Sequence, residues 1–141
     1  MMCNTDCEDF LCRHGIRPTA NRIMIVKALH EAGRPMSIAE LESWLPSIDK
    51  SNIFRALSVF SSGHMVHRIE DGGEGVRYEL CLSHEEGHDD DMHAHFYCEI
   101  CHKTFCLEEL HVDNVNVPSG YEVHSVNYVI KGICPNCSHK I

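Results

Sequence analysis

Apolar residues in the first half of the chain recur every three or four positions, the spacing of a helix with one buried face. The two clearest stripes are Ile23, Met24, Val26, Ala28 and Leu29, and Ile53, Leu57 and Phe60. Start and stop signals flank these stripes and two shorter candidates. We therefore predict four helices, over residues 5–14, 19–32, 37–45 and 49–63.

Residues that cap helix ends support these boundaries. Thr19 caps the second helix, and Ser37 with Glu40 forms a capping box at the third, in which each side chain serves a backbone N–H. The fourth helix is capped by Asp49 or Ser51.

Beyond residue 64 the apolar period changes to two, which is typical of strands. Strands are predicted over residues 65–70 and 76–82, joined by a glycine-rich hairpin turn. Three helices followed by a hairpin are typical of a winged helix-turn-helix. The fourth predicted helix of the chain, the last one before the hairpin, is then the recognition helix. Three further strands are predicted over residues 93–97, 103–107 and 126–133, around pairs of cysteines.

The cysteine pairs predict a metal site. Cys98 and Cys101 form one C-x-x-C turn, Cys134 and Cys137 form another, and 32 residues separate them. Two such turns complete a closed tetrahedral site with no position for a substrate, so we expect structural Zn²⁺. A redox dithiol pair is the alternative.

Charge is divided unevenly along the chain. Residues 13–68 hold eight basic and four acidic residues, and the remainder holds four basic and seventeen acidic ones, giving a net charge of −9. The positive net charge of residues 13–68 indicates that this part of the chain binds nucleic acid. These patterns together predict an α+β fold: a winged-helix DNA-binding domain (1–82), an acidic hinge linker (83–92) and a small zinc-stapled α/β domain (93–141), the part that pairs in the dimer which the resemblance given below implies.

Composition limits the cellular setting. The chain has no apolar run of eighteen residues and no basic-then-apolar start, so neither a membrane span nor a signal peptide is expected. Nine cysteines without such a signal favour metal ligation in a reducing cytoplasm.

The order of these features resembles the ferric uptake regulator family of metal-sensing repressors. A winged helix precedes His93-Ala94-His95-Phe96-Tyr97-Cys98-Glu99-Ile100-Cys101, and a second C-x-x-C lies near the end. The stretch 15–19, Arg22 and the segment 51–57 match the family's DNA-binding half. The resemblance implies a homodimer on palindromic double-stranded DNA, with no enzymatic activity, no small-molecule substrate and no membrane partner. The residues expected at the DNA are Arg17, Thr19, Arg22, Ser51, Asn52, Phe54 and Arg55.

The resemblance also implies a regulatory metal at the hinge. The expected ligands are His67, Cys81, His93, His95 and Cys106, with Glu79 as a further candidate. Cys81 stands where the zinc uptake regulators carry a ligand cysteine. Thiolate and imidazole together suit Zn²⁺ better than Fe²⁺.

Several departures from the family bear on the type of sensor. Met92 and Ala94 remove a second regulatory site, and residues 118–120 replace a usual helix. The zinc-sensor hypothesis therefore stands beside an iron-responsive one and a peroxide- or thiol-redox-responsive one. A zinc nucleobase deaminase is disfavoured, because neither cysteine pair is preceded by proline.

Overall fold

The computed structural model describes residues 3–70, 75–81, 93–111, 116–123 and 126–138. The chain divides into two compact units, Met1–Leu82 and Ser83–Ile141, and each is described here by itself. Residues 71–74 of the predicted hairpin turn and residues 83–92 of the predicted linker lie outside the described residues.

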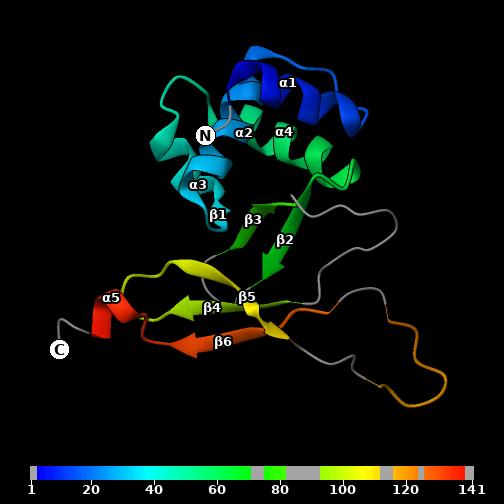
Figure 1. The fold of residues 1–141 in the computed structure, drawn as a ribbon, viewed down its shortest axis with the longest axis vertical. Helices are drawn as coiled ribbons and strands as arrows, with labels where there is room; N and C mark the ends of the chain where they lie inside the picture. Colours follow the sequence, from blue (N-terminus) through cyan, green and yellow to red (C-terminus); the bar gives the residue numbers. More distant parts are fainter. Residues whose placement is uncertain (1–2, 71–74, 82–92, 112–115, 124–125, 139–141) are drawn as a thin grey trace. The chain divides into compact units, whose positions relative to one another are not determined.

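The first unit is a helical cluster with a small sheet (Figure 1). Its elements, in chain order, are α1 (Asn4–Arg13), α2 (Ala20–Ala32), β1 (Met36–Ser37), α3 (Ile38–Trp44), α4 (Lys50–Ser62), β2 (Val66–Glu70) and β3 (Val76–Leu80). The sheet has the order β1-β3-β2 and is antiparallel. This is the predicted winged helix-turn-helix arrangement.

Local hydrogen bonds explain where the helices begin and end. Thr19 accepts a hydrogen bond from the backbone N–H of Arg22 (3.3 Å) at the start of α2. Asp49, rather than Ser51, caps α4 by accepting from the N–H of Asn52 (3.1 Å). Gly33 ends α2 with a φ of 61°, a left-handed conformation that glycine adopts at little cost. The capping box at Ser37 is also present.

The core of the first unit contains the predicted stripe of α4, with Ile53, Leu57 and Phe60 all fully buried. The predicted stripe of α2 is partly wrong. Met24 is 37% exposed, and Ile25, which the prediction omitted, is fully buried. Residues 23–26 are all apolar, so periodicity alone does not fix the rotation of this helix.

Strand β1 was not predicted, because two residues are too few to show a period. Met36 pairs with Tyr78 and Ser37 pairs with Arg77, so the segment joins β3 on the side opposite β2. The sheet therefore holds the start of α3 against the wing strands.

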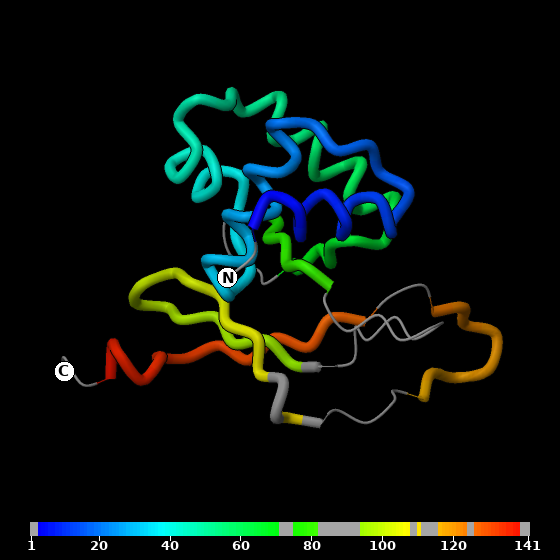
Figure 2. Tube along the Cα trace, turned by 45° about the horizontal axis from the view of Figure 1, so that its top comes forward, coloured from blue at the N-terminus to red at the C-terminus, as the bar shows by residue number. Residues whose placement is uncertain are grey.

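The second unit consists of β4 (His93–Cys98), β5 (Thr104–His111), β6 (Val129–Gly132) and a short helix α5 (Pro135–Ser138). The strand order is β5-β4-β6, with β4 antiparallel to β5 and parallel to β6. Strand β6 is shorter than predicted, β5 is longer, and α5 was not predicted. Residues 116–123 form a projecting loop without a helix (Figure 2), as the departure at 118–120 suggests.

In the described part of the chain, no helix has the length and apolar character needed to cross a membrane.

Candidate functional site

The two C-x-x-C turns meet in the second unit. One sulfur from each of Cys98, Cys101, Cys134 and Cys137 lies within 4.8 Å of the others. The Sγ atoms of Cys101 and Cys134 are 3.9 Å apart. A tetrahedral zinc–thiolate site with bonds of about 2.3 Å places its sulfurs about 3.8 Å apart. The four-cysteine cluster therefore fits a structural zinc ion.

Backbone groups are already oriented toward the cluster. The N–H groups of Cys101 and Cys134 donate to the Sγ of Cys98 at 3.5 and 3.4 Å. Burial raises the pKa of the Cys98 thiol, but hydrogen bonds from the backbone outweigh it and lower the pKa to about 6. Burial and the neighbouring thiols raise the pKa of Cys137 to about 12. Adjacent thiolates repel one another, so a bound cation is needed to keep all four deprotonated.

The strands around the cluster bring the two turns together. The first turn follows β4, and the second begins α5 directly after β6, which lies beside β4. The N–H of Glu99 donates to the carbonyl of Gly132 (2.8 Å). A Cβ at Gly132 would lie 3.0 Å from the ring of Phe96, so glycine allows β6 its close approach. Phe96 and Phe105 pack against the buried cysteines.

Three predicted regulatory ligands lie on the wing of the first unit. His67 of β2 and Glu79 of β3 are directly opposite each other, so their side chains share one face of the sheet. Cys81 follows β3 two residues after Glu79 and is only 2% exposed. Its N–H donates to the carbonyl of Met65 (2.9 Å).

Two more predicted ligands lie on the sheet of the second unit. His95 of β4 and Cys106 of β5 are directly opposite each other, and His95 is 7% exposed. The pair thus presents an imidazole and a thiol on one face of the β4–β5 ladder. His93 is the first residue of β4, but its side chain lies outside the described residues.

The residues predicted at the DNA lie on the outer sides of α2 and α4. Thr19 and Arg22 at the start of α2, together with Asn52 and Arg55 of α4, line one cavity of about 480 Å³. Sequence reasoning missed the other residues that line it, Asn21, Ala56, Ser58 and Val59. Exposure could have identified Asn21, Ser58 and Val59 only after the rotation of each helix was known, and Ala56 is buried.

The remaining predicted DNA residues are also placed at the surface. Phe54 is 54% exposed, which is unusual for a phenylalanine and gives α4 an apolar contact surface. Arg17 contributes its carbonyl, which accepts from the guanidinium of Arg22 (2.8 Å). The hydroxyl of Ser51 donates to Asp49 (3.3 Å).

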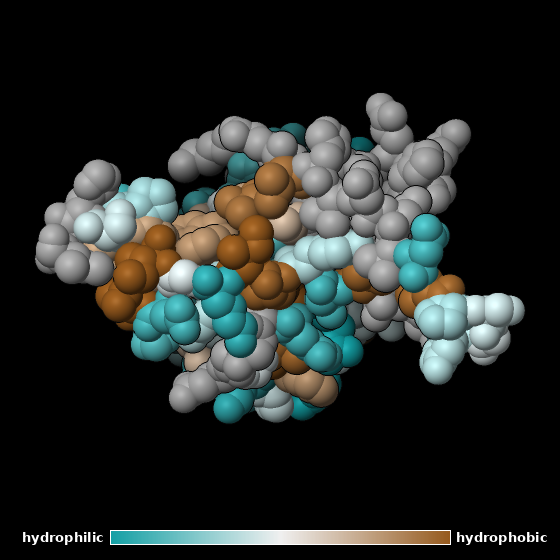
Figure 3. Space-filling model, turned by 90° about the horizontal axis from the view of Figure 1, so that it is seen from below, coloured by the Kyte–Doolittle hydropathy of each residue, from teal (hydrophilic) through white to brown (hydrophobic). Residues whose placement is uncertain are grey.

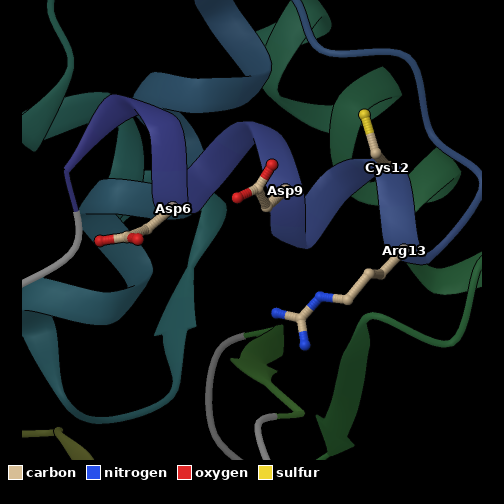
Figure 4. Close-up of a pocket in the computed structure, with 4 residues that line it drawn as sticks. All are labelled: Asp6, Asp9, Cys12 and Arg13. Atoms are coloured by element: carbon tan, nitrogen blue, oxygen red, sulfur yellow. The ribbon is translucent and has the colours of Figure 1, made fainter.

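A second hollow, of about 700 Å³, lies along α1 and contains none of the predicted site residues. Asp6, Asp9, Cys12 and Arg13 line it. Figure 4 shows Cys12 pointing to the other side of the helix from Arg13, so these side chains do not converge on one ion. We assign this hollow no function.

Comparison with known proteins decides the family. The sequence profile of the ferric uptake regulator family matches residues 13–131. The chain belongs to the ferric uptake regulator family. It is therefore a metal-responsive transcriptional regulator and not an enzyme, as the sequence predicts.

Proteins similar to this chain include relatives of low sequence identity. Ferric uptake regulation protein 2 of Mycolicibacterium fortuitum is 22% identical over 148 residues, which cover 98% of this chain and 97% of that protein. A zinc uptake regulator complexed with zinc and DNA has a TM-score of 0.66 at 16% identity, with 97% of this chain and 93% of that chain covered.

Other solved structures of the family bind or are named for other metals. The ferric uptake regulator of Vibrio cholerae has a TM-score of 0.63 at 18% identity, covering 90% of this chain and 98% of that chain. A zinc-bound manganese uptake regulator has a TM-score of 0.61 at 16% identity, with coverage of 91% and 98%. The shared fold therefore does not identify the regulatory metal.

Proposed function

We propose that this protein is a zinc-responsive repressor that binds a palindromic operator as a homodimer. The four-cysteine cluster holds a structural zinc ion. A second, regulatory zinc binds at the hinge through His67, Cys81, His93, His95 and Cys106, with Glu79 as a further ligand.

The observation that carries the choice of metal is the pairing of His95 with Cys106. An imidazole and a thiol directly opposite each other on adjacent strands form half of a tetrahedral site. Soft thiolate ligands favour zinc, whereas sites for iron and manganese more often contain carboxylate oxygens. Cys81 supplies a further thiol from the wing.

The DNA interface is formed by α4 and the start of α2. The N-terminal residues of a recognition helix contact base edges, and α4 carries Asn52, Phe54 and Arg55 in its first two turns. Arg22, across the cavity, is placed to neutralise a phosphate. The similarity of fold to a zinc uptake regulator solved with zinc and DNA supports this assignment.

Two features of the second unit, a small core and exposed apolar side chains, support a homodimer. Among its described residues, the buried cluster consists of Cys98, Cys134 and Cys137, with Phe96, Cys101 and Phe105 packed against it. So small a core is stabilised by metal and by association. Apolar side chains remain exposed on this unit, and Figure 3 shows apolar residues gathered in patches on one face. Among the residues of this unit that the structure describes, the exposed large apolar ones are Ile100, Leu110, Val117, Tyr121, Val123, Ile130 and Ile133.

A binding experiment with defined metals tests the proposal. Protein purified without added metal is analysed for zinc, then offered a random-sequence duplex library in excess zinc, in anaerobic ferrous ion, or with a weak chelator. We expect one zinc per chain after purification and enrichment of a palindrome only in excess zinc. Enrichment of a palindrome with ferrous ion alone would instead identify iron as the regulatory metal.

Treatment with peroxide distinguishes a thiol-redox regulator from a zinc sensor. Cys81 and Cys106 are thiols that peroxide oxidises if they are not held by metal. Loss of DNA binding after peroxide, with zinc held in excess, would favour a thiol-redox regulator over a zinc sensor.

A further inference from the structure

The side chain of Asn52 lies on the exposed side of α4 and is not engaged in the fold. The exposed uncharged polar residues of α4 are Ser51, Asn52, Ser58 and, at its last position, Ser62. The hydroxyl of Ser51 donates to Asp49, and the hydroxyl of Ser58 donates to the carbonyl of Phe54 (3.0 Å). Within the described part of the chain, the carboxamide of Asn52 makes no hydrogen bond.

The stability of α4 does not explain an asparagine at this position. Asparagine is a poor residue inside a helix and is favoured at caps, where its side chain bonds to the backbone. Here Asp49 is the cap, and it accepts from the backbone N–H of Asn52. Asn52 therefore lowers the intrinsic propensity of the first turn without serving as its cap.

The position of Asn52 fits base contact. It lies in the first turn of α4 and lines the cavity that also contains Arg22 and Arg55. Recognition helices place first-turn residues against base edges, while flanking arginines contact phosphates or guanine. A carboxamide can donate an N–H to the N7 of adenine while its oxygen accepts from the N6 amino group in the major groove.

We propose that Asn52 reads an adenine in each operator half-site and fixes the base preference of the protein at that position. The inference rests on the proposed function, because it needs α4 to enter the major groove. Asn52 is then the residue that determines which base is preferred at one position of each half-site.

Selection from a random-sequence duplex library, in excess zinc, tests the proposal with three proteins. Wild type should enrich a motif with an A·T pair at one position of each half-site. Asn52→Ala should enrich the same motif without that preference, a loss of about 5- to 150-fold in discrimination. Alanine is the best helix former, so α4 should be retained.

Asn21→Ala is the matched control. Asn21 is an exposed asparagine that lines the same cavity from α2. Its removal should weaken binding to all sequences alike and leave the motif unchanged.

A modified operator provides a second measurement. The enriched duplex is made with 7-deaza-adenine at the selected position, which removes the N7 acceptor alone. Wild type should bind this duplex more weakly than the unmodified one, whereas Asn52→Ala should bind both equally.

The outcomes separate the two claims. If Asn52→Ala enriches an unchanged motif, or if both proteins lose the same affinity on the modified duplex, Asn52 does not read adenine and the proposed function stands. If wild type enriches no sequence with any metal, both the proposed function and this inference are wrong.

Discussion

At the scale of single residues, Glu40 joins three parts of the winged helix. Its carboxylate accepts from the backbone N–H of Ser37 in the capping box of α3, pairs with Arg34 (2.6 Å) in the preceding loop, and pairs with Arg77 of β3. Arg77 is only 6% exposed, so its guanidinium needs a carboxylate such as that of Glu40 to compensate its buried charge. Burial alone would raise the pKa of Glu40, but hydrogen bonds from Arg34 and Ser37 and the two arginine charges lower it below its ordinary value.

We expect Glu40→Gln to destabilise the first unit by about 1.5–3 kcal/mol, since a charged hydrogen-bond acceptor is lost beside a buried arginine. Because the folded pKa is lowered, this contribution is complete above the unfolded pKa of about 4.3 and disappears as pH falls through the folded value. Urea unfolding from pH 7 to pH 3 measures the difference. Glu42→Gln, an exposed glutamate on the same helix, should change little at any pH.

At the scale of elements, the two cysteine turns tie the end of β4 to the start of α5. A closed zinc site forms only in the folded unit, so its binding free energy, on the order of 10 kcal/mol, stabilises the fold. Cys98→Ser or Cys137→Ser should therefore give a protein without zinc that melts far below wild type. Elemental analysis and thermal unfolding test this, with the exposed Cys12→Ser as control. A zinc-free variant with wild-type melting would refute the assignment.

Helix α4 gives a second prediction at this scale. Arg55→Ala should abolish detectable operator binding while zinc content and dimerisation are retained, because Arg55 lies on the exposed side of the recognition helix. Fluorescence anisotropy on the selected duplex measures the affinity. Lys103→Ala removes an equal charge from the exposed surface of the second unit, and it should bind as wild type does. Equal binding by both variants would place a different helix in the groove.

What the sequence predicts best is local. The caps at Thr19, Ser37 and Asp49 depend on residues three positions apart, and the cysteine turns depend on residues of the same spacing. The features that the sequence does not predict depend on contacts between residues that are far apart in the chain. Strand β1 exists because β3 pairs with it, and the bond from Arg77 to Glu40 spans 37 residues. The proposed regulatory ligands came from the resemblance to the family, since no local spacing joins residues 67 to 106.

At the scale of the whole molecule, the proposed regulatory metal would couple two units of the same chain. Cys81 and His67 belong to the first unit, whereas His95 and Cys106 belong to the second. An ion bound by ligands from both would limit their relative orientation. Operator half-sites demand a fixed spacing between recognition helices, so metal binding should favour DNA binding. Linkage then requires DNA to raise metal affinity by the same factor.

We therefore expect excess zinc to raise wild-type affinity for the operator by about 5- to 150-fold, equivalent to a coupling of roughly 1–3 kcal/mol. Cys81→Ser and His95→Ala should fold, dimerise and keep one zinc per chain, yet bind the operator equally with and without excess zinc. Cys3→Ser, a substitution of an exposed cysteine outside both ligand sets, should respond as wild type does. Ligating thiols and imidazoles must be deprotonated, so the response should also fade at acidic pH. A full zinc response in both ligand variants would mean that the regulatory ion binds elsewhere, and a wild-type response to ferrous ion alone would identify an iron sensor on the same fold.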